Sequence, residues 1–286
     1  MAVDYRLSHF TAHRSGGRVS ACIIRRISQV RRAAHAMITI EHILAQAAAI
    51  ADDYARAVAD IPYEHKGVLF SEILFLCAAL GPERPERVVE SGRARGQSTH
   101  LLATCLPECE IVSVERNPDS PDVPVAAARL APFGNVQLLF GDAMRMLPEL
   151  VREGDAVLID GPKGYRALRL AFKVLASCRP RAVFIHDCGL GTEERKFLDR
   201  YVPETVYSDA PAFVERYAFL DAACRALNPD VAREDREPGR SYGPTVACVP
   251  YNPAQRYTSL LRRATLRGML DRLGARLRRR LRSAER

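Results

Sequence analysis

The stretch Arg87-Val-Val-Glu-Ser-Gly-Arg-Ala-Arg-Gly-Gln-Ser98 decides the fold of this 286-residue chain. Its two valines predict a short buried strand that ends at the acid Glu90. A turn from Gly92 to Gly96 follows, and residues 98–105 have the apolar spacing of a helix. A strand, an acid, a glycine turn and a helix in this order build a ligand pocket at the carboxyl end of a strand in an open α/β sheet.

The spacing of the glycines bears on which nucleotide such a pocket takes. Glycine lets the backbone approach a ligand closely and adopt positive φ, and the start of a helix adds free N–H groups. A dinucleotide fingerprint reads G-x-G-x-x-G, whereas here Gly92 and Gly96 lie four apart and Glu90 precedes the first by two. A carboxylate at that place repels a pyrophosphate and suits a ligand with a cationic or hydroxyl-rich part.

Four more apolar segments follow, and each is expected to be a strand. They are residues 111–115, 136–140, 156–160 and 182–187, with helical spacing in the segments between them. The residues that end the five strands are polar or acidic: Glu90, Glu115, Gly141-Asp142, Asp160 and His186-Asp187. Because parallel strands end at one edge of a sheet, these side chains are expected to gather where such sheets bind ligands.

The alternation of strands and helices predicts an α/β fold. We expect a Rossmann-like three-layer sandwich, in which a seven-stranded, mostly parallel sheet carries helices on both faces. Two helices, 39–60 and 66–80, are expected before the first strand, and residues 205–208 and 245–249 are expected to be the last two strands. The insertion at residues 210–243 is predicted either to shape substrate specificity or to form a homodimer contact.

The ordered motifs resemble those of class I S-adenosylmethionine-dependent methyltransferases, whose first motif is written [D/E]-x-G-x-G-x-G. The sequence matches this motif at Glu90, Gly92 and Gly96 and departs from it at the middle glycine, which is Ala94. The resemblance covers roughly residues 60–250 and implies that the cofactor is S-adenosyl-L-methionine.

The resemblance also implies which residues bind this cofactor. Glu90 and the two glycines would contact its methionine part, Glu115 the ribose hydroxyls, and Asp142 the adenine amino group. From the sequence alone, Asp142 is equally suited to cap the helix that follows it, and the two roles can coexist. The full set of implied cofactor-binding residues is Glu90, Gly92, Gly96, Gln97, Ser98, Glu115, Asp142, Ala143 and Asp160.

The chemistry is expected at the ends of the fourth and fifth strands. Methyl transfer to an oxygen requires that the acceptor lose its proton and lie in line with the methyl carbon. The spacing Asp160-x-x-Lys163 resembles the catechol O-methyltransferase type, which pairs a metal-binding Asp with a Lys three residues later. The candidate catalytic residues are Asp160, Lys163 and His186, and a lysine with a depressed pKa can take the proton. For Lys163 the alternative stays open that Gly161-Pro-Lys-Gly164 is an ordinary exposed turn.

A divalent metal ion, either magnesium or a transition metal, is expected at Asp160, His186 and Asp187. His186 departs from the acidic pair that ends this strand in the family, and imidazole suits zinc, iron or manganese better than magnesium. Three roles for His186 stay open: a general base in a metal-free site, a ligand to a transition metal, or a hydrogen-bonding cap on a buried strand.

The net charge of +8 is unevenly distributed along the chain. Residues 1–36 hold seven Arg and one Asp, which gives +6, and residues 256–286 hold eleven Arg, one Asp and one Glu, which gives +9; residues 37–255 therefore carry −7. An acidic central domain argues against nucleic acid in the pocket. Residues 1–36 are expected to be a disordered basic extension, either similar in composition to a transit peptide or upstream of a true start at Met37.

The remaining composition favours a cytoplasmic protein. The eight cysteines contain no C-x-x-C pair and no metal-ligand spacing, which predicts reduced thiols. No run of 18 apolar residues is present to predict a membrane span.

Residues 256–286 are expected to form a basic amphipathic helix. Its predicted apolar stripe consists of Leu266, Leu270, Leu273, Leu277 and Leu281, with arginines around it. Packing of these leucines on the chain's own domain is the favoured interpretation. Docking on an anionic membrane, on a protein partner or on nucleic acid is the alternative.

Together these features predict a methyltransferase that acts on a hydroxyl of a small molecule or a sugar. One alternative is a noncatalytic adenosyl-binding or scaffolding protein. Another is a nicotinamide-dependent oxidoreductase, which is disfavoured by the glycine spacing and by the lack of a Tyr-x-x-x-Lys pair near the fourth and fifth strands.

Overall fold

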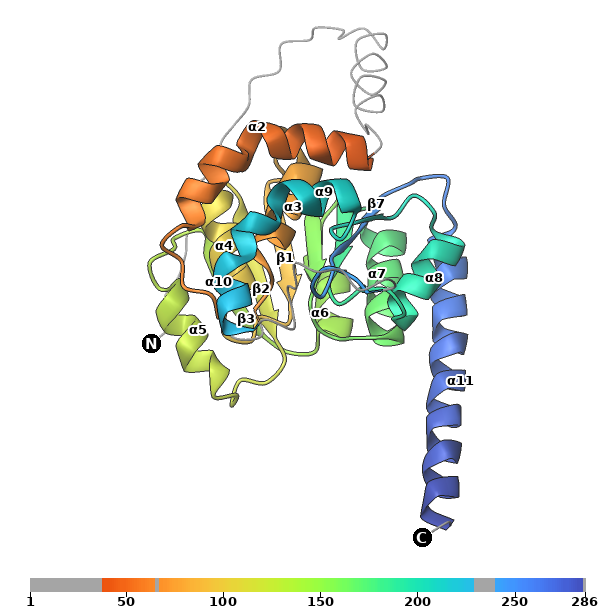
Figure 1. The fold of residues 1–286 in the computed structure, drawn as a ribbon. Coiled ribbons are helices and arrows are strands. Elements are labelled where there is room, and N and C mark those ends of the chain that lie inside the picture. The colour runs from red at the N-terminus through yellow and green to blue at the C-terminus, as the bar shows by residue number, and fades with distance from the viewer. Residues whose placement is uncertain (1–37, 65–66, 229–239, 285–286) are drawn as a thin grey trace, which may run out of the picture. The chain divides into compact units, whose positions relative to one another are not determined.

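A computed structural model describes residues 38–64, 67–228 and 240–284, with side chains up to Arg276. Seven strands form one sheet in the order β3-β2-β1-β4-β5-β7-β6 (Figure 1). The first five strands are parallel, and β7 runs antiparallel to both β5 and β6. The predicted α/β fold with a seven-stranded, mostly parallel sheet is confirmed. The strands are β1 Arg87–Ser91, β2 Glu110–Glu115, β3 Val136–Phe140, β4 Ala156–Ile159, β5 Ala182–Ile185, β6 Val206–Tyr207 and β7 Ala247–Pro250.

Helices fill the connections that the sequence predicts to be helical, including part of the insertion. Residues 229–239, which belong to the insertion at residues 210–243, and residues 1–37 lie outside the described part of the chain. The helices are α2 Ile40–Val58, α3 Phe70–Leu80, α4 Gln97–Cys105, α5 Asp122–Leu130, α6 Ala143–Leu150, α7 Tyr165–Cys178, α8 Glu193–Tyr201, α9 Pro211–Tyr217, η1 Ala218–Asp221, α10 Ala222–Leu227 and α11 Tyr257–Ala284.

The sheet has a hydrophobic core on each face, because successive strand residues point to opposite sides. Val88 of β1 and Phe184 of β5 belong to the core that includes α2, α3, α4 and α9. Their neighbours Val89 and Ile185 belong to the core that includes α6, α7, α8 and α11. Both faces of the central strands are therefore buried in apolar surroundings. These strands end in polar residues at the carboxyl edge of the sheet.

Helix α3 is buried along its entire length, from Phe70 to Leu80. A helix that is apolar all round belongs inside a protein, and ten of its eleven residues carry no charge. The exception is Glu72, which is 1% exposed. An ionised carboxylate in such a place requires a partner, and this partner lies in the candidate site.

Helix α11 packs on α7 with a face that includes the small residues Ala264 and Gly268. Leu260, Ala264 and Gly268 are spaced by four and are buried. A Cβ at Gly268 would lie 2.8 Å from Cβ of Tyr165, so only glycine permits this approach between the two helices.

The favoured interpretation of the leucine stripe is wrong for the described part of α11. Leu266, Leu270 and Leu273 are 60%, 55% and 54% exposed instead of packed on the domain. The close approach at Gly268 decides which face of the helix points inward, and the leucines lie on another face. Leu277 and Leu281 are beyond the described side chains.

No helix among the described residues combines the length and the apolar character that a membrane crossing requires.

The glycine turn after β1 packs directly on the loop after β4. Gly92 has φ of +88°, and a Cβ built on it would lie 2.6 Å from the backbone N of Gly161. The backbone N–H groups of Asp160 and Gly161 both donate to the carbonyl oxygen of Ser91, at 2.9 and 3.0 Å. These backbone contacts fix the position of Asp160 relative to the turn.

Replacing Gly92 with alanine is expected to lower the free energy of unfolding by about 3 kcal/mol, because both the positive φ and the contact with backbone atoms oppose a side chain. Urea denaturation monitored by circular dichroism measures this change. Gly134→Ala is the matched control, since no described atom lies within 4 Å of a Cβ at that turn. Equal stabilities of the two variants would show that the two loops are not packed as described.

Candidate functional site

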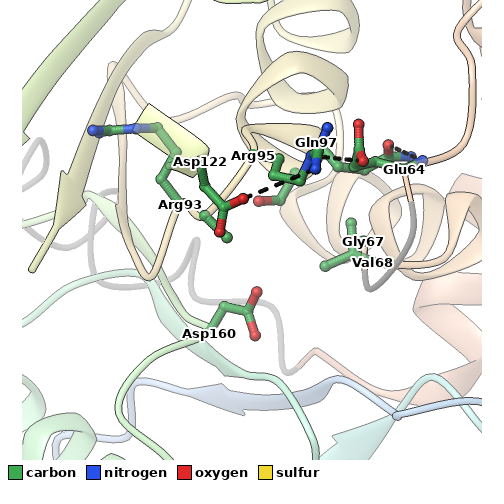
Figure 2. A pocket seen from close by; sticks show the side chains of 10 residues that line it. Glu64, Gly67, Val68, Arg93, Arg95, Gln97, Asp122 and Asp160 are labelled. Atoms are coloured by element: carbon green, nitrogen blue, oxygen red, sulfur yellow. Dashed lines mark hydrogen bonds and ion pairs between the residues drawn. The ribbon is translucent and has the colours of Figure 1, made fainter. Parts of the chain in front are cut away.

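A pocket of about 210 Å³ lies beside the glycine turn and the start of α4 (Figure 2). Its far wall comes from the segment between α2 and α3, and Asp160 after β4 lies at its edge. It is thus at the carboxyl edge of the sheet, as the order of the motifs predicts. The residues that line it are Glu64, Gly67, Val68, Arg93, Ala94, Arg95, Gln97, Ser98, Asp122 and Asp160.

Gln97, a predicted cofactor-binding residue, joins two walls of the pocket. Its Oε1 accepts a hydrogen bond of 2.8 Å from the backbone N–H of Glu64. Its Nε2 is buried and has no hydrogen-bond partner among the described residues. Buried polar groups are rarely left unsatisfied, so Nε2 is an unused donor on a residue that lines the pocket.

An ionic network at the rim of the pocket was not predicted from the sequence. The carboxylate of Glu64 pairs with Arg95 and with Arg129, both at 2.7 Å. Arg95 also lies 4.0 Å from Asp122, as the dashed lines in Figure 2 show. Glu64 and Arg95 lie in loops, and Asp122 and Arg129 lie in the first and last turns of α5. At such positions neither periodicity nor motif spacing marks a charged side chain as functional.

Arg93 lines the pocket but turns its charged end away from it. The Arg93 side chain extends away from the cavity in Figure 2. Its Nη1 donates to the carbonyl oxygen of Ser113 at 2.8 Å, and its guanidinium lies 5.1 Å from the centre of the Phe140 ring. Arg93 therefore fastens the turn to β2 and β3.

Glu90 is fully buried behind the pocket wall. Its carboxylate accepts hydrogen bonds from the hydroxyls of Ser98, Thr99 and Ser113. Burial raises the pKa of Glu90, and these three hydrogen bonds act against that increase. Ser98 lines the pocket and donates a hydrogen bond to Glu90, so Glu90 is connected to the pocket through Ser98. Its direct contact with the methionine part of the cofactor stays a prediction.

Glu115 and Asp142 hold backbone N–H groups in this structure. Glu115 accepts from Ala94 in the glycine turn, at 3.0 Å, and from Arg116 at 2.7 Å. Asp142 caps α6 by accepting from the N–H of Met144 at 3.0 Å, so the predicted capping role is confirmed. Neither residue lines the pocket, nor does Ala143, which is buried in the first turn of α6. Their contacts with ribose and adenine stay predictions.

The structure brings Asp160, Lys163, His186 and Asp187 together beside the pocket. Lys163 Nζ lies 2.5 Å from Asp160 Oδ1 and also pairs with Asp187. His186 Nδ1 lies 2.9 Å from Asp160 Oδ1 and 3.3 Å from Asp187 Oδ1. Because Asp160 also lines the pocket, these four residues form a charged cluster that opens onto it.

Glu72 is the residue of this cluster that the sequence analysis missed. Its Oε2 lies 3.2 Å from His186 Nε2 and accepts a 2.8 Å hydrogen bond from the N–H of Leu69. His186 therefore lies between Glu72 at Nε2 and the carboxylates of Asp160 and Asp187 at Nδ1. A single acid within the apolar run Phe70–Leu80 was the available signal, since it must be paired if that helix is buried.

The charges of the cluster reinforce one another. Burial would lower the pKa of His186, but Asp160 and Glu72 raise it well above its ordinary value. Burial would raise the pKa of Asp160, but His186 and Lys163 hold it below its ordinary value. The pKa of Asp187 is lowered in the same way, with His186 and Lys163 outweighing burial.

The expectation that Lys163 has a depressed pKa is wrong. Burial acts in that direction, but the carboxylates of Asp160 and Asp187 outweigh it and raise the pKa of Lys163. A raised pKa means that the ammonium form is favoured. In this arrangement Lys163 is a cation at neutral pH and cannot accept a proton.

The cluster also fits a divalent metal ion. One ligand atom each from Asp160, His186 and Asp187 lies within 4.8 Å of the others. The Nδ1 atom of His186 is buried and has no hydrogen bond of acceptable geometry to the described residues, while Nε2 faces Glu72. A histidine that binds a metal through one nitrogen commonly donates the other N–H to a carboxylate. One imidazole and two carboxylates suit a transition metal better than magnesium.

Comparisons with known proteins return structural neighbours only. No family model and no curated protein matches the sequence. The S-adenosylhomocysteine-bound methyltransferase PaMTH1 of Podospora anserina aligns with 84% of this chain and 100% of its own, at 14% identity and a TM-score of 0.41. The O-methyltransferase TomG of Streptomyces achromogenes, involved in tomaymycin synthesis and bound to SAM, aligns with 79% of this chain and 96% of its own, at 19% identity and a TM-score of 0.40. Cofactor-bound Rv0187 from MTB aligns with 72% of this chain and 90% of its own, at 24% identity and a TM-score of 0.39. We base the functional proposal on the residues of the site.

Replacing His186 with leucine is expected to lower the free energy of unfolding by about 3 kcal/mol near neutral pH, because Glu72 is left buried without its cation. The raised folded-state pKa of His186 adds stability fully below the unfolded value of about 6.5, and this is lost as the pH rises through the raised pKa. The cost of the substitution is therefore expected to shrink in alkaline buffer. Denaturant titrations at several pH values, in the presence of a chelator, measure this.

His42→Leu, a substitution on α2 outside the cluster, is the control for the loss of a histidine elsewhere. A small and pH-independent effect of His186→Leu would show that His186 and Glu72 do not form a charged pair.

Proposed function

We propose that this chain is an S-adenosylmethionine-dependent methyltransferase that methylates a hydroxyl of a small molecule or a sugar. The observation that carries this proposal is the position of Asp160, which lines the pocket beside the glycine turn and also belongs to the charged cluster. A methyl donor bound in the pocket would therefore lie next to the groups that handle the acceptor hydroxyl. Neighbouring sites for donor and acceptor are what an in-line transfer requires.

The pocket has the donors and charges that suit this cofactor. Gln97 Nε2 is a free donor, and the carboxylates of Glu64, Asp122 and Asp160 line the walls. The carboxylate of Asp160 in the pocket wall is a partner for the ammonium or sulfonium group of such a ligand. The glycine spacing of the turn, which departs from G-x-G-x-x-G, supports this cofactor over a nicotinamide dinucleotide.

The cluster supplies electrostatic stabilisation of the acceptor oxygen. As the methyl group passes from sulfur to oxygen, the sulfonium becomes a neutral sulfide and the hydroxyl loses its proton. Lys163 and His186 are both cations in this arrangement, and fixed positive charge stabilises the oxygen as it becomes negative. The proton must leave to a group that is not already protonated, so one of the two must first lose its own proton or a carboxylate must accept it.

A divalent ion would be held by Asp160, His186 and Asp187, with Glu72 orienting the histidine. When bound, such an ion lowers the pKa of an acceptor hydroxyl and fixes its orientation. Lys163 pairs with the same two carboxylates, so its ammonium competes with an ion for them.

S-adenosylhomocysteine is expected to bind the full chain in the micromolar range, while NADH does not bind. Glu115→Ala is expected to weaken binding by about tenfold or more, because removing a charged hydrogen-bond partner costs at least about 1.5 kcal/mol. Isothermal titration calorimetry measures both ligands on the same preparation.

Glu110→Ala is the matched control, since it removes a carboxylate at the opposite end of the same strand. Absence of binding by S-adenosylhomocysteine, or a preference for NADH, overturns the proposed function. If the cofactor product binds but Asp160→Asn leaves every cellular role unchanged and no acceptor hydroxyl is methylated, the chain is a noncatalytic adenosyl-binding protein.

Lys163→Met is expected to raise the affinity for Mn²⁺ by about tenfold or more at neutral pH, because the substitution removes a cation that already pairs with two of the ligands. Calorimetric titration with MnCl₂ measures it without any acceptor. Lys196→Met, which removes an exposed ammonium from α8, controls for a general change in charge. An affinity for Mn²⁺ that Lys163→Met does not change would mean that the metal binds elsewhere. If neither the unsubstituted chain nor this variant binds Mn²⁺, the cluster is metal-free.

A further inference from the structure

The outward face of α11 is apolar in a helix that is otherwise basic. We call Leu266, Met269, Leu270 and Leu273 the apolar strip; each is between 49% and 60% exposed. In a helix with 3.6 residues per turn, Leu266 and Leu270 lie about half a turn away from Ala264 and Gly268, the residues that face α7. The strip therefore points away from the domain.

The packing of α11 fixes this orientation. Tyr165 of α7 lies so close to Gly268 that a Cβ at this position would not fit. Rotation of α11 would break this contact. Arg263 is also held on the domain, with its guanidinium 5.3 Å from the centre of the Tyr201 ring. In Figure 1 the helix runs beside α7 and then continues beyond the helices around it. The apolar strip cannot be turned inward by a small adjustment.

Arginines border the apolar strip. By helical position Arg263 lies on one side of the strip and Arg276 on the other, with Arg262 one turn before Leu266. No arginine of α11 forms an ion pair with a carboxylate within the described part of the chain. A helix face that combines leucines with arginines can contact an apolar layer and an anionic layer at the same time.

We propose that the outward face of α11 docks this protein on an anionic lipid surface. The leucines and Met269 would enter the boundary between headgroups and acyl chains, and the arginines would pair with lipid phosphates. Charge excludes the other simple occupant, a second copy of the same face, because residues 256–286 hold eleven arginines against two acids and would repel their duplicate. A nucleic acid would use the arginines but leave the apolar strip exposed.

Flotation of the full chain with phospholipid vesicles tests this proposal. We expect binding to vesicles that contain phosphatidylglycerol, weaker binding to pure phosphatidylcholine, and release by high salt. The triple variant Leu266→Ser, Leu270→Ser, Leu273→Ser is expected to partition at least about tenfold less into the anionic vesicles. The pair Arg262→Gln, Arg276→Gln is expected to reduce binding to anionic vesicles and to leave binding to phosphatidylcholine unchanged.

Leu227→Ser and Phe219→Ser are the matched controls, because both side chains are more than half exposed on other helices. Retained binding of S-adenosylhomocysteine and an unchanged thermal melting curve show that each variant is folded, so a failure here is separate from a failure of the proposed function. Three outcomes overturn the proposal: no binding to any vesicle, binding that survives the serine triple variant, or a dimer in light scattering that the same variant dissociates.

Discussion

The pairing of Glu72 with His186 is the interaction on which the site depends. A carboxylate in the middle of a buried helix is costly unless a cation meets it, and His186 at the end of β5 is that cation. Its second ring nitrogen then lies against Asp160, whose backbone is held by Ser91 at the end of β1. Charged contacts and backbone hydrogen bonds thus connect α3, β5, β4 and the glycine turn, and they set the distance between the pocket and the cluster.

The parts of the fold that could be predicted from the sequence are those that depend on the spacing of apolar residues and on the polar residues that end each strand. Each central strand is apolar on both faces, and each stops at a polar residue, so the sheet and its functional edge were readable before the structure. Asp160, Lys163, His186 and Asp187 meet because parallel strands end together. Glu72 was missed because nothing in a helix sequence says which strand end it will face. Glu64 and Arg95 were missed because loop geometry assembles them.

The C-terminal helix shows why spacing alone does not decide packing. Its leucine stripe was read correctly as one face, yet Ala264 and Gly268 form the face that packs. Small residues let two helix backbones approach closely, and the resulting contacts extend along both helices, whereas leucines would hold α7 at a distance. A sequence pattern identifies an amphipathic helix, but the shape of the neighbouring surface selects the face that is buried.

The electrostatics of the cluster change what its lysine can do. A lysine between two carboxylates is stabilised as a cation, so Lys163 acts by its charge for as long as Asp160 and Asp187 are free to pair with it. Asp160 and Asp187 would also hold a divalent ion, together with His186. With those carboxylates so engaged, Lys163 would lose the contacts that raise its pKa, and the neutral amine that can accept a proton would be favoured. On the proposed function, Lys163 would supply positive charge beside the acceptor oxygen while it pairs with both carboxylates. It would be free to act as the base that the spacing Asp160-x-x-Lys163 suggests only where an ion held those carboxylates instead.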